Sequence, residues 1–300
     1  MAVVQRKVQR GRRRTGIGNC AVVSVVGTSM VLAAGMASAA FAQATKEYRY
    51  TVAPHAIISV DTLYGAISAR PGSDREVVVT ATLKSNNVEV DQHQSGNRVE
   101  IASHLVRGTD QPSGRVDYQL VIPPDATLNL RSSTGPLSVE RLEGDLTLEG
   151  ADATVDVRNV ENGHVHVRTM GGPIVLTDVR NGHVEVSTIT GDIHLQSVAG
   201  PLLLATSGRG KIWYDGDFGS SGEYRFTTHS GNIEALVPAD VSADFRAHSV
   251  LGRVQHDFPL TPVHSRFHEE VGRSFFGTTG QASSQVVLRS FSGKIRLKQR

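Results

Sequence analysis

The sequence predicts an all-β protein, a two-sheet parallel β-solenoid similar to a β-helix, with about 19 residues in each two-strand repeat and a β-rich N-terminal cap. Glycines divide most of the stretch between residues 135 and 231 at intervals of 9 or 10 residues, and short runs that alternate polar and apolar residues follow them. Period-two alternation indicates strands with one buried face. The glycines stand at positions 135, 144, 163, 172, 182, 191, 200, 210, 222 and 231.

The second observation is that equivalent residues recur one repeat apart. An additional apolar residue precedes every second turn, at Leu142, Val160, Val179 and Val198. A fixed repeat of this kind favours stacked coils, in which each coil packs on its neighbours, over a hairpin meander or a sandwich. The expected stacks are Val165 on Val184 on Leu202, Val167 on Val186 on Leu204, and Val155 on Ile174 on Ile193 on Ile212.

The glycine before each run is expected to supply a positive φ or a tight corner that other residues would resist. Asn162-Gly163 and Asn181-Gly182 strengthen this interpretation, since asparagine also tolerates the left-handed region.

Residues 1–42 have the pattern of a secretory signal peptide. Six basic residues between Arg6 and Arg14 precede an apolar segment from Cys20 to Met36, and Ala40-Phe41-Ala42 offers a small-x-small cleavage site. We therefore expect cleavage after Ala42, with a retained membrane anchor as the alternative.

Removal of this segment changes the charge of the protein. The chain has 31 basic and 29 acidic residues, and six basic but no acidic residues lie in 1–42, so the mature part carries −4. The basic character thus belongs to the targeting segment and gives no support to nucleic-acid binding. Because Cys20 is the single cysteine, the mature chain has neither a disulfide nor thiol chemistry.

The mature chain is expected to form one domain with four parts. Residues 43–134 form an N-terminal β lead-in or cap, with strands at 76–83, 88–90, 98–102, 116–122 and 127–130 and exposed loops at 92–96 and 107–114. Residues 135–257 carry the solenoid repeats. Residues 258–284 lack periodicity and form an irregular loop or an inserted hairpin, and residues 285–300 supply terminal strands that complete the same domain.

These features resemble the bacterial DUF4097 family, whose members are called candidate adhesins. The resemblance rests on the Gly-x-Ile-x-Leu and Gly-x-Val-x-Val runs, on Pro123-Pro124-Asp125 and Pro238-Ala239-Asp240 before coils, and on the terminal run from Ser292 to Leu297. It covers about residues 50–300. It implies an exported or envelope β-repeat protein and transfers no catalytic residue.

Metal sites have weak support. His164 and His183 are expected to lie one strand spacing apart, and His166 on Glu185, which a metal could bridge. The alternative is that these are ordinary outward residues of strands. Asp215-Gly216-Asp217-Phe218-Gly219 resembles a fragment of a calcium loop but lacks the later acidic ligand, and a longer turn explains it better.

Catalysis would need convergent carboxylates, for which Asp152, Asp156 and Asp178 are the candidates. Nothing in their spacing groups them, and we expect no catalytic, cofactor-binding or metal-ligating residues. Aromatic residues concentrate where the repeat lengthens, at Trp213, Tyr214, Phe218, Tyr224 and Phe226. Trp213 could offer a sugar-stacking surface, whereas Tyr214, Tyr224 and Phe226 alternate into the core.

The predicted function is that of an exported, non-enzymatic β-repeat protein, an adhesin or a cell-envelope scaffold. The expected partner is a cell-envelope or extracellular polysaccharide or a protein, and neither nucleic acid nor a membrane span after signal cleavage is expected. The alternatives are a polysaccharide-active enzyme on the same scaffold and a protein-binding accessory in envelope-stress signalling. The predicted location is periplasmic, cell-surface or extracellular.

Overall fold

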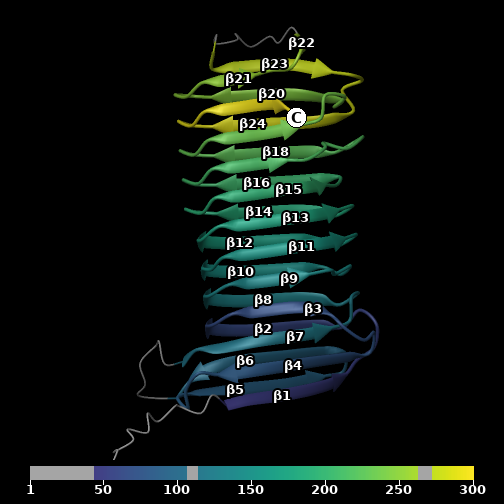
Figure 1. Cartoon of the computed structure of the whole chain (residues 1–300), viewed down its shortest axis with the longest axis vertical. Helices are drawn as coiled ribbons and strands as arrows, with labels where there is room; N and C mark the ends of the chain where they lie inside the picture. Colours follow the sequence, from purple (N-terminus) through teal and green to yellow (C-terminus); the bar gives the residue numbers. More distant parts are fainter. Residues whose placement is uncertain (1–43, 107–113, 263–271) are drawn as a thin grey trace, which may run out of the picture. The chain divides into compact units, whose positions relative to one another are not determined.

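Two facing sheets make up the computed structural model, which describes residues 44–106, 114–262 and 272–300 (Figure 1). Every regular element in these residues is a strand, as the sequence predicted. The 12-stranded sheet has the spatial order β1 (Ala44–Thr51), β4 (Glu76–Leu83), β7 (Val116–Ile122), β3 (Ile67–Pro71), β9 (Leu137–Glu140), β11 (Val155–Glu161), β13 (Ile174–Arg180), β15 (Ile193–Ala199), β17 (Ile212–Asp215), β19 (Ile233–Val237), β25 (Ile295–Gln299) and β21 (Val254–His256).

The 13-stranded sheet lies opposite. Its order is β22 (Thr261–Pro262), β23 (Ser274–Thr279), β20 (Ala243–Ser249), β24 (Ser284–Ser290), β18 (Glu223–Thr228), β16 (Leu202–Ser207), β14 (His183–Thr188), β12 (Val165–Gly171), β10 (Leu146–Asp152), β8 (Thr127–Thr134), β2 (Ile57–Tyr64), β6 (Arg98–Leu105) and β5 (Val88–Ser95). The predicted signal peptide, residues 1–42, lies outside the described residues.

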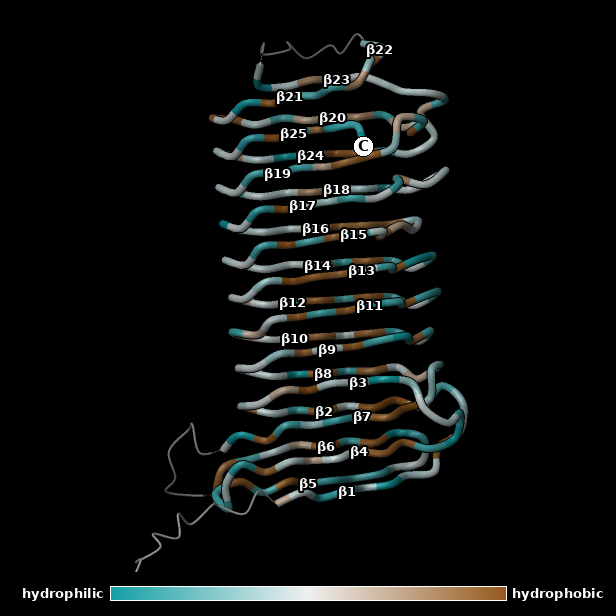
Figure 2. Tube along the Cα trace, viewed as in Figure 1, coloured by the Kyte–Doolittle hydropathy of each residue, from teal (hydrophilic) through white to brown (hydrophobic). Residues whose placement is uncertain are grey.

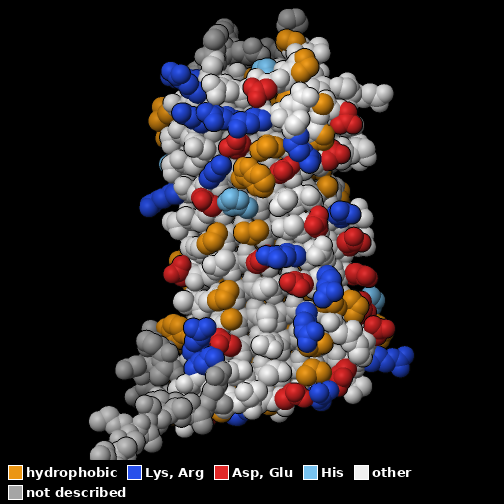
Figure 3. Space-filling view, viewed as in Figure 1, with side chains coloured by type: hydrophobic (Ala, Val, Ile, Leu, Met, Phe, Trp, Pro, Cys, Tyr) orange, Lys and Arg blue, Asp and Glu red, His pale blue; other side chains and the backbone are white. Residues whose placement is uncertain are grey.

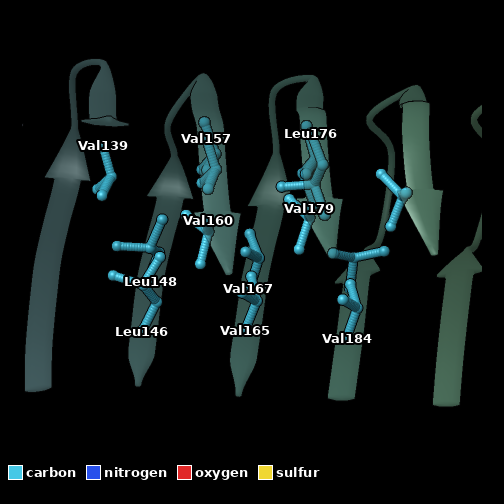
Figure 4. Packing of buried hydrophobic residues seen from close by; sticks show 14 of the residues in the cluster. Val139, Leu146, Leu148, Val157, Val160, Val165, Val167, Leu176, Val179 and Val184 are labelled. Atoms are coloured by element: carbon cyan, nitrogen blue, oxygen red, sulfur yellow. The ribbon is translucent and has the colours of Figure 1, made fainter. Parts of the chain in front are cut away.

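The central coils are parallel and in register, which confirms the solenoid. Strands of one sheet alternate in sequence with strands of the other, and each pairs with the strand one repeat away. The predicted stack of Val155, Ile174, Ile193 and Ile212 is present. Inward residues from both sheets point toward one another and fill the space between them (Figure 4), and apolar stretches recur in strand after strand (Figure 2).

Two predicted stacks are wrong at their last residue, Leu202 and Leu204. Val184 pairs with Leu203 and Val186 with Ala205, so Leu202 and Leu204 face outward. Gly200 lies over Gly182, which stands 18 residues earlier in the chain. Pro201 adds one residue between Gly200 and β16, so the paired residues of β14 and β16 are 19 residues apart. Because side chains alternate along a strand, an offset of 19 rather than the predicted 18 residues exchanges the inward and outward faces of β16.

Glycine is required at the corners mainly by close approach between coils. A Cβ on Gly163 would lie 2.3 Å from the carbonyl oxygen of Gly144, and one on Gly182 would lie 2.1 Å from that of Gly163. Among the predicted corner glycines, only Gly135 and Gly172 have positive φ, so the dihedral explanation is wrong for most of them. Asn162 and Asn181 do have positive φ, which confirms the expected role of asparagine.

The coil of β2 and β3 stacks directly on that of β8 and β9. The residues between them supply β4 to β7, which continue both sheets in the other direction and include antiparallel pairs. Hydrogen bonds join the two outermost strands, from Tyr50 Oη to Gln92 Oε1 (2.5 Å) and from Gln94 Nε2 to the carbonyl of Thr51 (2.9 Å). The predicted loop at 92–96 is therefore wrong, since β5 continues to Ser95.

The last strands in sequence are not the last in space. β24 pairs with both β18 and β20, and β25 pairs with both β19 and β21. β20, β21 and β23 thus lie beyond the C-terminal coil (Figure 1). β23 falls in the segment for which the sequence predicted an irregular loop or an inserted hairpin.

Candidate functional site: the Trp213 platform

Trp213 lies on the outer face of the 12-stranded sheet. Its neighbours in β17, Ile212 and Tyr214, are fully buried, so alternation turns the indole outward, where it is half-buried. Strand pairing places His194 of β15 on one side of it and Glu234 of β19 on the other. The rings of His194 and Trp213 have centroids 5.8 Å apart, at an interplanar angle of 39°. We call Trp213 with His194 the Trp213 platform.

Cations surround this platform. Glu234 forms ion pairs with Lys298 (2.5 Å between Nζ and Oε1) and Lys211 (3.2 Å between Nζ and Oε2). The hydrogen bond from Lys298, followed by that from Lys211, holds the pKa of the Glu234 carboxyl below its usual value against the opposing effect of burial. Glu234 therefore neutralises part of the local positive charge and fixes the positions of both ammonium groups.

Further cations on the same face are not neutralised. Arg296 of β25 lies opposite Glu234 of β19 in the strand register, and Lys294 directly precedes β25. Among the described residues, neither Arg296 nor Lys294 forms an ion pair. In Figure 3, Lys and Arg gather in the upper third of the visible face, at the level of β19, β25 and β21, and apolar side chains form only small separate patches. The platform thus places an outward indole near cationic side chains, which suits an anionic ligand with an apolar face.

The other aromatic residues of this region belong to the core, as the sequence favoured. Tyr214, Phe218, Tyr224 and Phe226 are fully buried. Tyr214 stacks on Phe218 with ring centroids 4.9 Å apart, and its hydroxyl donates to the carbonyl of Asp217 (2.8 Å). Burial raises the pKa of the Tyr214 phenol. Of these five aromatic residues, Trp213 is the one that faces outward.

The histidine ladder exists with the predicted spacing. The rings of His164 and His183 are 4.8 Å apart, edge to face, and His166 lies beside Glu185 (3.5 Å). The backbone N–H of His164 donates to Asp145 Oδ1 (2.8 Å), which lowers the pKa of that carboxyl. Within the part of the chain that the structure describes, no three His, Cys, Asp or Glu residues come together as a metal site would require.

The loop at Asp215–Gly219 forms a turn. Asp217 Oδ1 accepts the N–H of Gly219 (3.2 Å), and Asp215 forms an ion pair with Arg300 (3.2 Å). Both carboxylates thus have partners within the protein.

Two of the three carboxylates weighed for catalysis, Asp156 and Asp178, are paired along their own strands, whereas Asp152 is exposed at the end of β10. Arg158 binds both oxygens of Asp156, at 2.9 and 2.6 Å, and Arg180 lies 3.7 Å from Asp178. Asp178 has positive φ, like Arg141, Asn159 and Ser197 at the equivalent positions, and each precedes an inward Leu or Val. Asp178 therefore has a backbone role at this recurring position, which accounts for it without a catalytic role.

Sequence reasoning missed a buried polar column. A Ser or Thr three residues before a corner glycine points into the core in successive coils, and from Thr188 onward its hydroxyl oxygen accepts the glycine N–H. Examples are Ser207 to Gly210 (2.8 Å) and Ser290 to Gly293 (2.8 Å), and the same Ser207 hydroxyl donates to the carbonyl of Gly191 one coil earlier (3.0 Å). The recurring Ser/Thr-x-x-Gly pattern would have shown this column.

Two hollows were missed as well, because they join residues from several coils. One of about 520 Å³ lies between β5, β6, β2, β8 and β10, and one of about 400 Å³ lies between β16, β18, β24 and β20. Among the described residues, there is also no helix with the length and apolarity that crossing a bilayer requires.

Parallel two-strand coils with in-register cores and glycine corners define a β-repeat protein. The family model described as Toastrack DUF4097 matches residues 56–298, and the chain belongs to this family.

Solved structures that are similar to this chain include one described as a candidate cell adhesion protein from Clostridium sporogenes (12% identity, 86% of this chain and 100% of that chain, TM-score 0.28). Candidate adhesins from Parabacteroides distasonis (15%, 87% and 98%, TM-score 0.39) and Bacteroides fragilis (9%, 85% and 97%, TM-score 0.37) are also similar. Likeness at this level carries no argument about function. Comparison with curated proteins gives no match.

Proposed function

We propose that this protein is an exported, non-enzymatic binding module that holds an acidic polysaccharide of the cell envelope or the extracellular space on the outer face of its 12-stranded sheet. The observation that carries the proposal is the outward Trp213, whose neighbour in register, Glu234, binds Lys211 and Lys298 and separates Trp213 from Arg296 of β25. An indole can cover the apolar face of a sugar ring, while Lys and Arg pair with carboxylate or phosphate groups.

The repeat itself supports binding over catalysis. Successive coils present equivalent outward positions about 4.8 Å apart, which gives an extended polymer many similar contacts. The carboxylates Asp156 and Asp178 are engaged with Arg158 and Arg180. Export is supported by the basic, apolar and small-residue pattern of residues 1–42.

The test uses purified residues 43–300 with a polyuronate such as alginate and with neutral dextran of similar length. We expect alginate binding in calorimetry and pull-down, and little retention on dextran. Trp213→Ala should weaken alginate binding about fivefold, since an aromatic contact contributes about 1 kcal/mol. The matched control is Met170→Ala, which truncates another outward apolar side chain, on a corner away from the platform.

Binding should also weaken with salt, and Lys294→Ala with Arg296→Ala should reduce that dependence. Unchanged affinity in the Trp213 and Lys294/Arg296 variants would contradict the platform. Release of new reducing or unsaturated ends from alginate would contradict the non-enzymatic assignment.

A further inference from the structure

A column of exposed residues follows the corner that leads from the 13-stranded sheet to the 12-stranded sheet. The buried hydroxyl column described above fixes its order, since Thr169, Thr188, Ser207, Thr228, Ser290 and Ser249 pair in that sequence. The residue after each hydroxyl residue turns outward. These corner residues are, in spatial order, Met170, Ile189, Gly208, His229, Phe291 and Val250.

Most of this column is apolar and exposed, but it is interrupted at Gly208. Met170 is 60% exposed, Ile189 55% and Phe291 44%. The backbone continues without a break, because the N–H groups of Gly208, His229 and Phe291 each donate to the preceding coil. The missing side chain at Gly208 therefore leaves a notch in an otherwise continuous ridge.

The hollow of about 400 Å³ lies beside this notch. One wall is aromatic: the rings of His229 and Phe291 stack on each other with centroids 4.9 Å apart and an interplanar angle of 2°, so the pair offers an outer ring face and ring edges to a ligand. The hydroxyl residues Thr206 and Thr227 also line the hollow, from directly paired positions of β16 and β18.

The charge of the hollow is positive. Arg289 continues the row of Thr206 and Thr227, and His248 lies beside it on β20. No carboxylate is among the described residues that line the hollow, and within the same residues Arg289 forms no ion pair. By contrast, Arg225 and Arg246 on the same sheet face are paired with Glu223 (2.7 Å) and Asp244 (2.8 Å).

We propose that this hollow binds a pyranose ring that carries a carboxylate, such as one hexuronic acid residue. The outer face of the stacked His229–Phe291 pair packs against the C–H face of the ring, Arg289 pairs with the carboxylate, and Thr206 and Thr227 hydrogen-bond to ring hydroxyls. The inference deepens the proposed function and rests on it for the source of the ligand, an acidic polysaccharide. The hollow opens on the 13-stranded sheet, whereas Trp213 lies on the 12-stranded sheet, so the two surfaces can be tested separately.

The experiment measures binding of a uronate trisaccharide and of a neutral glucose trisaccharide to residues 43–300 by calorimetry. Arg289→Gln should weaken binding of the uronate about tenfold, and Phe291→Ala about fivefold. Arg225→Gln, an outward arginine outside the hollow, and Trp213→Ala should each stay within about twofold. Both altered side chains of the hollow are exposed, and an unchanged urea midpoint shows that each variant is folded.

Three results would overturn the proposal. They are no uronate binding at about 10 mM, equal binding of the neutral trisaccharide, and Arg289→Gln and Phe291→Ala variants with unchanged affinity. If Trp213→Ala alone reduces binding, the platform stands and the hollow is rejected. If the hollow variants alone reduce binding of both trisaccharide and alginate, the hollow stands and the platform is rejected.

Discussion

Gly210 shows how strongly one residue is constrained by the coil beside it. A Cβ at this position would lie 1.7 Å from the carbonyl oxygen of Gly191, and the same geometry recurs at Gly191, Gly231 and Gly293. The atom in the way belongs to the backbone of a paired coil, so it cannot move without breaking strand pairing. The regular spacing of these glycines in the sequence therefore reflects the close approach of successive coils at the corners.

We expect Gly210→Ala to lower the free energy of unfolding by at least about 2 kcal/mol, because the coil must shift to admit the methyl group. Gly171→Ala is the matched control. Its Cβ would first meet Asp152 Oδ1 at 3.1 Å, the end of a flexible side chain, so its cost should stay below about 1 kcal/mol. Urea unfolding of both variants checks this, and equal costs would contradict the coil-spacing explanation.

Glu234 gives a prediction about pH at the same scale. Its pKa is lowered in the folded protein by Lys298 and Lys211. The stabilisation from this carboxylate is therefore complete above the unfolded-state pKa and is lost as the pH falls through the lower folded-state pKa. Lys298→Met should raise the pKa of Glu234 toward its ordinary value, as measured by carbon NMR titration of the carboxyl. Lys46→Met on β1 should leave that titration unchanged.

At the scale of the element, the corners that follow β14, β16, β18, β20 and β24 are closed by a buried hydroxyl as well as by glycine. In the coil of β16, Ser207 accepts from Gly210 and donates to the carbonyl of Gly191, so it joins two successive corners. Its side chain is buried, so water cannot replace these bonds. Serine and threonine fit this position because one hydroxyl can both donate and accept.

Ser207→Ala should therefore cost about 1–3 kcal/mol, since it leaves a buried N–H and a buried carbonyl without their partner. Thr206→Ala, one residue earlier and outward, should stay within about 0.5 kcal/mol. Chemical denaturation of the pair measures the difference. A similar loss of unfolding free energy in both variants would contradict the role of the Ser207 hydrogen bonds.

At the scale of the whole molecule, both ends of the repeat array are formed by strands that lie between two coils in the sequence but outside them in space. β4 to β7 extend the array beyond the first coil, and β20, β21 and β23 extend it beyond the last. The outermost strands β1 and β5 carry charged side chains such as Glu47, Arg49 and Asp91. Charges on the edge strands of a sheet oppose pairing with a further chain.

The interior position of β24 and β25 predicts an effect of truncation. Removal of residues 284–300 should leave β20 and β21 without their parallel partners, while β9 to β17 keep theirs. Hydrogen exchange should therefore become fast in residues 243–256 and remain slow in residues 155–195. Removal of Arg300 alone is the control and should preserve protection throughout. Continued protection of residues 243–256 in the longer truncation would contradict the pairing.

The sequence by itself determined the strands, the parallel two-sheet coil and most of the register, because a period-two pattern and a 19-residue repeat describe local surroundings. It also turned Trp213 outward through the alternation of Ile212 and Tyr214. The faces of Leu202 and Leu204 follow from the same repeat, since Leu203 stands 19 residues after Val184, and the expectation for them failed because it followed the 18-residue step from Gly182 to Gly200. The tertiary structure was needed for features that join distant segments. It alone placed β24 and β25 inside the array and joined Arg289, Phe291 and Thr206 in one hollow. Such features depend on pairing between strands far apart in the chain, which no local pattern encodes.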